Sequence, residues 1–491
     1  MTDPYQIQRK EYIQALHCTP TQIVVALSGG GTLMLGDLLT IPGGSRTLIE
    51  ASVPYSAESI SEYIGRDPEQ FCCPRTARNL ATAAFYRARK VLRAEFLRKQ
   101  GYVNLERVSP KSVDVSHDIE GITDSAIIRS FQWVTPDDID AISRYQHIMG
   151  IGCTASLVTD RVKKGKHRVH VAIQTLQRTI QFSLEFQKDT RTRLEEERLV
   201  ADLILNAIET TRKQETELPP LSFSRVLANQ DVLFPVFIEG TSDDYPLCNN
   251  IPLKLQSGEV IHGKQTVGSS LLVDLFFGKL GAVLWTQEGI RNFIAYKDID
   301  AAPFNPCAEF THAVFPGSFS PIHQGHQEMI HIAERRLQEK AVLEISVQNV
   351  NKPPVDYIEL EQRLQQISSA NPQQAVWLTQ TPLFVRKAEL FRGATFIVGA
   401  DTIKRLADLR LYQDNIHILH EILRTIASYD CRFLVFARQS KNGLDSLESL
   451  EMPDMLRSLC DEVPPSVFTM NISSSDLRRM EDPSTDLPSL E

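Results

Sequence analysis

The sequence has neither a long apolar run nor the cysteine pattern of a secreted or metal-binding protein. No stretch approaches the roughly 18 apolar residues that cross a bilayer, and the chain does not open with the apolar core of a signal peptide. Its eight cysteines show no repeated Cys-x-x-Cys spacing, which argues against a zinc cluster or a disulfide framework. We therefore expect a cytoplasmic protein with reduced thiols, no membrane partner and no metal held by its own side chains.

Basic residues are also scarce relative to acidic ones. The 52 Lys and Arg residues are outnumbered by 61 Asp and Glu residues, and the formal net charge is −9. Without a basic field, little counterion release can drive binding to DNA or RNA, so no nucleic-acid partner is expected. A local basic run at 163–168 lies between apolar stretches and is interpreted as a solvated hairpin.

A chain of 491 residues is too long for one hydrophobic core, so two or three domains are expected. Apolar residues repeat at helical spacing between 191 and 211, and a polar, Pro-containing linker follows at 213–220. Short apolar runs divided by Gly, Asn and Asp then predict strands between 221 and 306. The resulting division is an α/β domain at 1–215, a small strand-rich bridging segment at 216–306 and an α/β domain at 307–491.

The most informative segment is V-F-P-G-S-F-S-P-I-H-Q-G-H at 314–326. It predicts an apolar strand, a Gly/Pro turn and a helix whose first turn carries His323 and His326 on one face. Free backbone N–H groups and the positive end of the helix dipole favour a bound phosphate at such a position. Gly317 permits a tight turn, and Gly325 leaves room for phosphate oxygens to approach the backbone.

A second segment, I-S-S-S-D-L-R at 472–478, predicts another helix start. Ser473 and Asp476 have the spacing of a capping box, and Arg478 falls within the first turns. Alone, each segment has a simpler explanation, because a Gly/Pro/His turn is often only a turn and a Ser-rich start only a cap. Together they predict a pocket in which hydroxyls, amides and a guanidinium face one nucleoside triphosphate.

With both segments present in this order, residues 309–485 resemble the HxGH nucleotidyltransferase superfamily. Its members carry a G-(S/T)-F-x-P-x-H-x-G-H motif early and an I-S-S-(S/T)-x-x-R motif late. Ser320 is a departure, since many relatives have Asp or Asn there. The resemblance implies a Rossmann-like parallel sheet. It also implies that ATP is bound by Gly317, Ser318, Phe319, Gly325, Ile472, Ser473, Ser474 and Ser475.

Two further segments extend this resemblance. The run F-I-V-G-A-D-T at 396–402 predicts a buried parallel strand whose carboxyl end meets a ligand. Gly399 and Asp401 resemble the G-x-D segment with which mononucleotide adenylyltransferases hold adenosine, although a buried strand before an ordinary capped helix is the alternative. Lys352 stands where relatives carry a phosphate-contacting lysine, and a solvated surface lysine is its alternative.

The chemistry implied is nucleotidyl transfer, in which a phosphate oxygen of an acceptor attacks the α-phosphorus of ATP and pyrophosphate leaves. His323, His326, Lys352 and Arg478 are the expected catalytic donors, because they can neutralise charge on the transferred and departing phosphates. Mg²⁺ held mainly by the ATP phosphates would complete the site. The expected partners are ATP and a small phosphorylated metabolite, and a homo-oligomer is left open.

The N-terminal domain carries a second resemblance. Residues 23–32 run from a strand into a Gly-rich turn and a helix, and Tyr55 follows. This order resembles the competence/damage-inducible amidase family, which deamidates nicotinamide mononucleotide with a serine nucleophile. Ser28 would be that serine, but Ile60 stands where the family's lysine is expected and Met149 where a threonine is expected. We expect an amidase-like fold with a vestigial site at Ser28 and Tyr55.

One chain thus resembles both a nicotinamide-nucleotide amidase and a mononucleotide adenylyltransferase. This association makes nicotinamide or nicotinate mononucleotide the leading acceptor, although fold and motif alone do not determine the acceptor. Trp377, Thr381 and Phe384 are the candidate acceptor-binding residues, since an aromatic face can stack on a pyridine ring. A core position is the alternative for Trp377. Also open are a cytidylyl- or adenylyltransferase for another phosphorylated metabolite, and a metabolite-binding regulator with degenerate sites. The sequence does not decide between ATP and CTP or between amide and acid.

Because serine is a poor nucleophile without a base that removes its proton, the full chain is expected to release no ammonia from nicotinamide mononucleotide. The measurement is a coupled ammonia assay on the wild-type chain and on a Ser28→Ala variant, with an active amidase as positive control. Ammonia release that disappears in Ser28→Ala would contradict this expectation.

Overall fold

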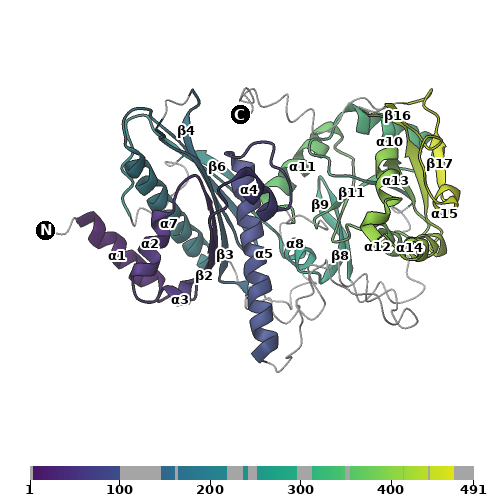
Figure 1. The fold of residues 1–491 in the computed structure, drawn as a ribbon. Helices are drawn as coiled ribbons and strands as arrows, with labels where there is room; N and C mark the ends of the chain where they lie inside the picture. Colours follow the sequence, from purple (N-terminus) through teal and green to yellow (C-terminus); the bar gives the residue numbers. More distant parts are fainter. Residues whose placement is uncertain are drawn as a thin grey trace. The chain divides into compact units, whose positions relative to one another are not determined.

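The structure is a computed structural model that describes residues 4–99, 145–160, 164–217, 236–241, 251–295, 312–348, 354–412, 414–440 and 443–468. The chain divides into two compact units (Figure 1). The first unit is Met1–Val273 with Val350–Glu361, and the second is Asp274–Asn349 with Gln362–Glu491. Both contain a sheet and covering helices, which confirms the predicted α/β class. Within the described ranges, no helix combines the length and apolar character needed to cross a membrane.

The first unit is built on a seven-stranded sheet of order β2-β1-β3-β4-β5-β7-β6. β1 pairs in parallel with β2 and β3, and the remaining pairs are antiparallel. The strands are β1 (Gln22–Ser28), β2 (Leu48–Ser52), β3 (Ile148–Ser156), β4 (His167–Gln174), β5 (Arg178–Phe186), β6 (Val236–Thr241) and β7 (Ile261–Val267). The helices are α1 (Pro4–Leu16), α2 (Leu33–Thr40), α3 (Gly44–Thr47), α4 (Ala57–Ile64), α5 (Pro74–Lys99) and α7 (Arg193–Glu217), with α8 (Ser270–Phe276) at the division between the units.

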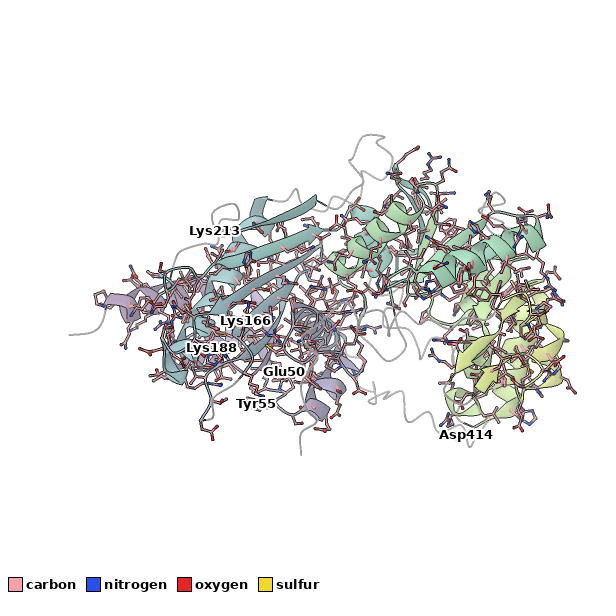
Figure 2. All side chains as sticks on the ribbon, turned by 90° about the horizontal axis from the view of Figure 1, so that it is seen from above. Glu50, Tyr55, Lys166, Lys188, Lys213 and Asp414 are labelled. Atoms are coloured by element: carbon pink, nitrogen blue, oxygen red, sulfur yellow. The ribbon has the colours of Figure 1, made fainter. Side chains whose placement is uncertain are left out.

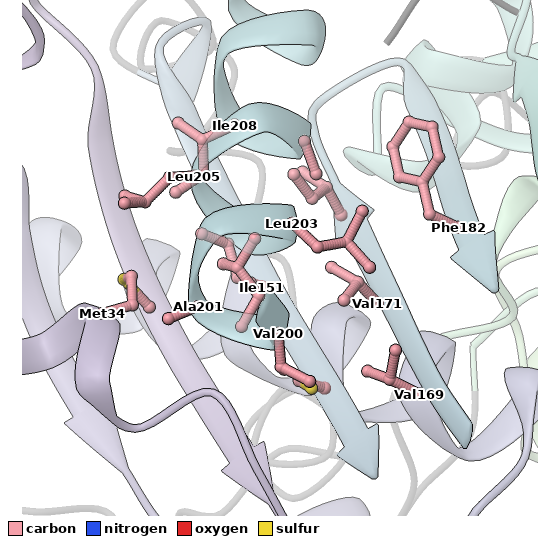
Figure 3. Packing of buried hydrophobic residues seen from close by; sticks show 14 of the residues in the cluster. Met34, Ile151, Val169, Val171, Phe182, Val200, Ala201, Leu203, Leu205 and Ile208 are labelled. Atoms are coloured by element: carbon pink, nitrogen blue, oxygen red, sulfur yellow. The ribbon is translucent and has the colours of Figure 1, made fainter. Parts of the chain in front are cut away.

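One face of this sheet buries α7 (Figure 3). Alternate strand residues such as Ile151, Val171 and Phe182 share one apolar cluster with Leu203 and Ile208 of the helix. Successive residues of a strand point to opposite faces, so this alternation places one face of the sheet against the helix. The apolar spacing at 191–211 is thus the buried side of α7.

The opposite face is crossed at very short range by α5. A Cβ atom on Gly152 would lie 2.1 Å from the carbonyl oxygen of Ala77, and one on Gly150 would lie 2.2 Å from that of Ala81. Any larger residue would have to displace the helix backbone, so both positions require glycine. These two glycines fix the path of α5 along β3.

The second unit has an eight-stranded sheet of order β17-β14-β13-β10-β11-β12-β8-β9. From β17 to β12 every neighbouring pair is parallel, and β8 and β9 add an antiparallel edge. The strands are β8 (Leu280–Thr286), β9 (Gly289–Ala295), β10 (Ala313–Pro316), β11 (Ala341–Ser346), β12 (Val376–Thr379), β13 (Thr395–Gly399), β14 (Arg432–Phe436) and β17 (Cys460–Val463), with a separate ribbon of β15 (Arg438–Ser440) and β16 (Gly443–Asp445).

The chain order of the parallel strands reverses between β10 and β13. From β10 it runs outward through β11 to β12, and then returns to the other side of β10 to continue through β13, β14 and β17. This is the doubly wound order of a Rossmann-like sheet, as the resemblance implies. The intervening helices are α10 (Gln324–Leu337), α11 (Tyr357–Ala370), α12 (Phe384–Leu390), α13 (Ala400–Leu406), α14 (Ile416–Ser428) and α15 (Asp454–Ser458), with a 3₁₀ turn at Leu409–Tyr412.

The strand-rich segment predicted at 216–306 contains strands, but they are divided between the two sheets. β6 and β7 extend the first sheet, whereas β8 and β9 extend the second. The strands at the edge of a sheet have unpaired backbone N–H and C=O groups. The short strands β6 to β9 can satisfy these groups by pairing with the edge of either sheet. The predicted boundary at 306/307 lies outside the described residues.

Replacing Gly152 by Ala is expected to lower the free energy of unfolding by about 1 to 3 kcal/mol, the usual cost of overpacking. Gly36→Ala is the matched control, because Gly36 lies within α2 and nothing is found within 4 Å of its added Cβ. That control is expected to be neutral or stabilising by up to about 1 kcal/mol. Urea denaturation measures both, and equal effects would contradict the close packing of α5.

Candidate active site

The candidate site lies where the strand order of the second unit reverses, at the carboxyl ends of β10 and β13. β10 leads into α10, and β13 leads directly into α13. In open α/β sheets, ligands bind in the crevice outside the carboxyl ends at such a switch point. Two of the segments predicted to bind ATP, the histidine turn and Gly399–Asp401, start from these two strands.

The turn after β10 is held by the ring of Phe319. Phe319 has a left-handed φ of 44°, unusual for a bulky residue, and its side chain is completely buried. The ring packs edge-to-face on Phe315 and His326, with centroid distances of 5.3 and 5.1 Å. A Cβ on Gly317 would lie 2.6 Å from this ring, so the close packing of Phe319 favours glycine at this position. Ser318 is exposed.

The two histidines stack on each other at the start of α10. His323 is the N-cap residue, and its backbone N–H donates to Nδ1 of His326 at 3.2 Å. The ring centroids are 3.7 Å apart, with an interplanar angle of 27°. Nδ1 of His323 is buried and has no hydrogen-bond partner in the described part of the chain. Buried polar atoms are normally paired, so this atom is a natural contact for a bound ligand or its water.

Both imidazoles are held in the neutral form. Burial, followed by the charges of His323 and Arg438, lowers the pKa of His326 to about 3. Burial and Arg438 also lower the pKa of His323. Because Nδ1 of His326 accepts a hydrogen bond from the backbone, the ring proton of the neutral form resides on Nε2. His326 can therefore donate an N–H to a phosphate oxygen without carrying a charge of its own.

An ion pair between Asp401 and Arg438 adjoins the histidines. Nη1 of Arg438 donates to Oδ2 of Asp401 at 2.5 Å, and the two side chains are 30% and 43% exposed. The carboxylate of Asp401 folds back over Gly399, where a Cβ would lie 2.5 Å from Oδ1. Arg438 was not predicted from the sequence. Its position after the apolar run of β14, at the carboxyl edge of the sheet, could have indicated it.

The predicted acceptor residues occupy different surroundings from those expected. Trp377 is fully buried in β12 and packs 5.8 Å from Phe391, so its ring offers no open face for stacking and the core alternative is favoured. Thr381 is also buried and donates to the hydroxyl of Thr379 at 3.1 Å. The ring of Phe384 is partly exposed and packs edge-to-face against neighbouring phenylalanines.

A buried ion pair lies beside the histidine turn. Nζ of Lys387 and the hydroxyl of Thr379 each donate to Oε1 of Glu344 at 2.5 Å. The carbonyl oxygen of Glu344 accepts the N–H of Gly317 at 2.9 Å. Burial lowers the pKa of Lys387, while Glu344 opposes that shift. This pair was not predicted from the sequence, although a glutamate inside the apolar run of β11 is unusual and could have indicated it.

Several predicted site residues lie outside the described residues. These are Lys352, Ile472, Ser473, Ser474, Ser475 and Arg478. Their assignment to phosphate binding stays a prediction. In the part of the chain that the structure does describe, no group of three or more His, Cys, Asp or Glu side chains is arranged to hold a metal ion.

Among the described residues, the suggested amidase site shows no hydrogen bond that would activate its serine. Ser28 ends β1 and makes no hydrogen bond to a basic or acidic side chain among the described residues. Tyr55 is 65% exposed (Figure 2). Ile60 is buried against Ala26 and Leu80, where it packs as an ordinary core residue. The lack of a visible base agrees with a vestigial site, which stays a prediction.

The helix that follows the Gly-rich turn already holds an anion from its own chain. Oε1 of Glu197 accepts the backbone N–H of Thr32 at 2.6 Å, its hydroxyl at 2.8 Å and the N–H of Leu33 at 3.3 Å. A carboxylate at this position satisfies free N–H groups and the positive end of the dipole of α2. No ligand anion is needed there.

Residues 314–480 match the cytidylyltransferase-like family, and this range contains both histidines, Asp401 and Arg438. No curated protein sequence matches the chain. Two similar solved structures are the competence/damage inducible protein CihA from Agrobacterium tumefaciens and a competence-damaged protein (CinA) superfamily protein from Klebsiella pneumoniae. The first is 13% identical over 43% of this chain and 96% of that one, with a TM-score of 0.26. The second is 11% identical over 44% and 100%, with a TM-score of 0.24.

Replacing Arg438 by Gln is expected to raise the pKa of both His323 and His326, because it removes a positive charge that disfavours their protonation. NMR titration of the histidine ring protons measures this without any substrate. Arg432→Gln is the control, since Arg432 starts β14, the strand that precedes Arg438, and pairs instead with Asp461 at 3.1 Å. Unchanged histidine pKa values in Arg438→Gln would contradict the proximity of these groups.

Proposed function

We propose that this chain, whose residues 314–480 form a nucleotidyltransferase domain of the cytidylyltransferase-like family, transfers AMP from ATP to nicotinamide or nicotinate mononucleotide. The observation that supports it best is the gathering of His323, His326, Asp401 and Arg438 at the switch point of the sheet. These groups offer neutral N–H donors, one guanidinium and the positive end of α10 to a triphosphate.

The histidines suit triphosphate binding because of their protonation state. A neutral His326 donates through Nε2–H, and it lies at the positive end of α10, whose first turn carries no acidic residue. Arg438 supplies the nearby positive charge, and phosphate oxygens can compete with Asp401 for its remaining N–H groups. Lys352 and Arg478 are proposed as additional donors on the strength of the family resemblance.

The transfer itself needs no base from the protein. An anionic phosphate oxygen of the acceptor attacks the α-phosphorus, and the bond from that phosphorus to the bridging oxygen breaks. Pyrophosphate leaves with the electron pair of the broken bond. The proposed role of the side chains is to align two anions and to stabilise charge on the leaving group. Mg²⁺ bound mainly to the triphosphate would supply further charge neutralisation.

The acceptor is less supported than the reaction type. The choice of a pyridine mononucleotide depends on the pairing of two resemblances, and the burial of Trp377 removes the expected stacking platform. The matched family is described as cytidylyltransferase-like, so CTP with another phosphorylated metabolite is the second candidate. The polar side chains around Thr379 and Thr381 are buried, and they give no preference between these acceptors.

Replacing His326 by Ala is expected to lower kcat for pyrophosphate release by about 10²- to 10³-fold, the usual cost of losing one transition-state donor. His331→Ala is the control on the same helix, because His331 is exposed and lies further along α10. A fall of similar size in both variants would indicate damage to the helix instead of a catalytic role.

The substrate is identified by following pyrophosphate release with Mg²⁺ and each nucleotide–acceptor pair. ATP and CTP are tested against nicotinamide mononucleotide, nicotinate mononucleotide, phosphopantetheine and a phospho-alcohol. Turnover with ATP and a pyridine mononucleotide supports the proposal. If only another nucleotide–acceptor pair gives turnover, that pair replaces the proposed substrates. If the nucleotides bind but no pair gives turnover, a metabolite-binding regulator is favoured.

A further inference from the structure

A cavity of about 670 Å³ lies among α1, α2 and α7 of the first unit. These helices lie together on one side of the first sheet and share its apolar cluster (Figure 1). The cavity is within the usual size of pockets for small molecules, about 300 to 1,000 Å³. Neither Ser28 nor Tyr55 lines it, so it is distinct from the suggested amidase site.

A buried ion pair joins α1 to α7 at this cavity. Nε of Arg9 donates to Oδ1 of Asp202 at 2.8 Å, and Nη2 of Arg9 donates to Oδ2 at 3.0 Å. The side chain of Asp202 is fully buried, and this burial raises its pKa while Arg9 opposes the shift. Because a buried pair is seldom more stable than apolar residues of the same volume, helix packing gives little reason for it, whereas ligand binding would. Nη1 of Arg9 has no hydrogen-bond partner among the described residues.

The other two carboxylates that line the cavity are also engaged by the protein. Asp37 accepts a hydrogen bond from Nη1 of Arg198, and its Oδ2 lies 3.8 Å from Nε of Arg9. Glu195 accepts the backbone N–H of Thr192 at 2.7 Å and its hydroxyl at 2.9 Å, which caps the start of α7. None of these carboxylates is left to neutralise a further cation.

Cationic side chains are in excess around the cavity. Arg191 is paired with Glu259 at 2.5 Å. Lys10 and Lys254 also line the cavity, and neither makes an ion pair in the part of the chain that the structure describes. Arg198 uses only Nη1, so its Nε and Nη2 have no hydrogen-bond partner there. The cavity therefore carries uncompensated positive charge in a chain whose formal net charge is −9.

Apolar side chains also line this cavity. Leu33 and Ile41 of α2 are partly buried, and Leu199 of α7 is buried. Leu194, in the first turn of α7, is 67% exposed despite its large apolar side chain. An apolar group that covered Leu194 would remove this surface from water, which favours binding. The cavity thus combines unused cationic donors with an apolar wall.

We propose that this cavity is a binding site for an organic anion with an apolar body. Its phosphate or carboxylate group is held by Arg9, Lys10 and Arg198, and its apolar part lies on Leu33 and Leu194. Guanidinium groups with unused N–H donors match the geometry of such oxyanions. The site does not depend on the transferase chemistry of the second unit.

The test is isothermal titration calorimetry of the full chain with octyl phosphate and with octanoate. Arg198→Gln is expected to raise the dissociation constant about tenfold, because it removes a hydrogen bond to a charged group. Arg212→Gln is the matched control, since Arg212 lies on the same helix, is 30% exposed against 29% for Arg198, and does not line the cavity. Asp37→Asn is expected to lower the dissociation constant up to about fivefold, because it releases Arg198 from a competing carboxylate. Equal affinities in Arg198→Gln and Arg212→Gln, or weaker binding in Asp37→Asn, would overturn the proposal.

Further ligands and variants test the two halves of the proposed ligand. Leu194→Ser is expected to weaken binding of both octyl compounds about three- to tenfold, whereas Leu39→Ser, at a leucine that is 63% exposed and outside the cavity, is expected to have no effect. Octanol, which lacks the charge, and inorganic phosphate, which lacks the apolar part, are both expected to bind more weakly. Tighter binding of octyl phosphate or of octanoate identifies the anionic group, and either result supports the site. No binding of either compound, or equal binding of octanol, contradicts it, whereas Arg438→Gln is expected to retain binding whether or not the transferase function holds.

Discussion

The buried ring of Phe319 is the contact on which the candidate active site depends. It occupies a left-handed backbone position, presses on Gly317 and supports His326 from one side. Such a conformation is costly for a large residue and persists because the surrounding packing compensates for it. The orientation of His326, and through stacking that of His323, therefore follows from core packing beneath the turn.

The N-termini of α2 in the first unit and α10 in the second unit differ in whether a carboxylate of the protein caps them. At α2 the carboxylate of Glu197 accepts the free N–H groups, so that the helix end is neutralised within the protein. At α10 the corresponding positions are held by two histidines whose pKa values are lowered, so that no negative charge is supplied. Only the second arrangement leaves the dipole available to an external anion, which agrees with catalysis in the second unit.

Motif spacing predicted the parts of the site that are local in sequence. The positions of His323 and His326 on one turn follow from helical periodicity, and Gly399 and Asp401 follow from a strand that ends in Gly-Ala-Asp. Arg438, Glu344 and Lys387 were missed because their partners are distant in the chain. Their roles depend on which strands become neighbours, and a single sequence does not specify that.

The same limit applies to the fold. The doubly wound sheet followed from a family resemblance, whereas the division of β6 to β9 between two sheets did not, since edge pairing is decided by tertiary contacts. For Trp377, the sequence suggested a role in the site that its burial does not support. An aromatic residue in an apolar strand has the same sequence pattern whether it lines a pocket or fills a core, and here it fills the core.

The buried pair of Glu344 and Lys387 has a consequence for divergence of this domain. Either charge alone would be left uncompensated in the interior, whereas two apolar residues of similar volume could replace the pair at little cost. Positions 344 and 387 should therefore covary among relatives. A homologue with an aliphatic residue in the strand should also have lost the lysine from the helix, while the histidine turn next to it stays unchanged.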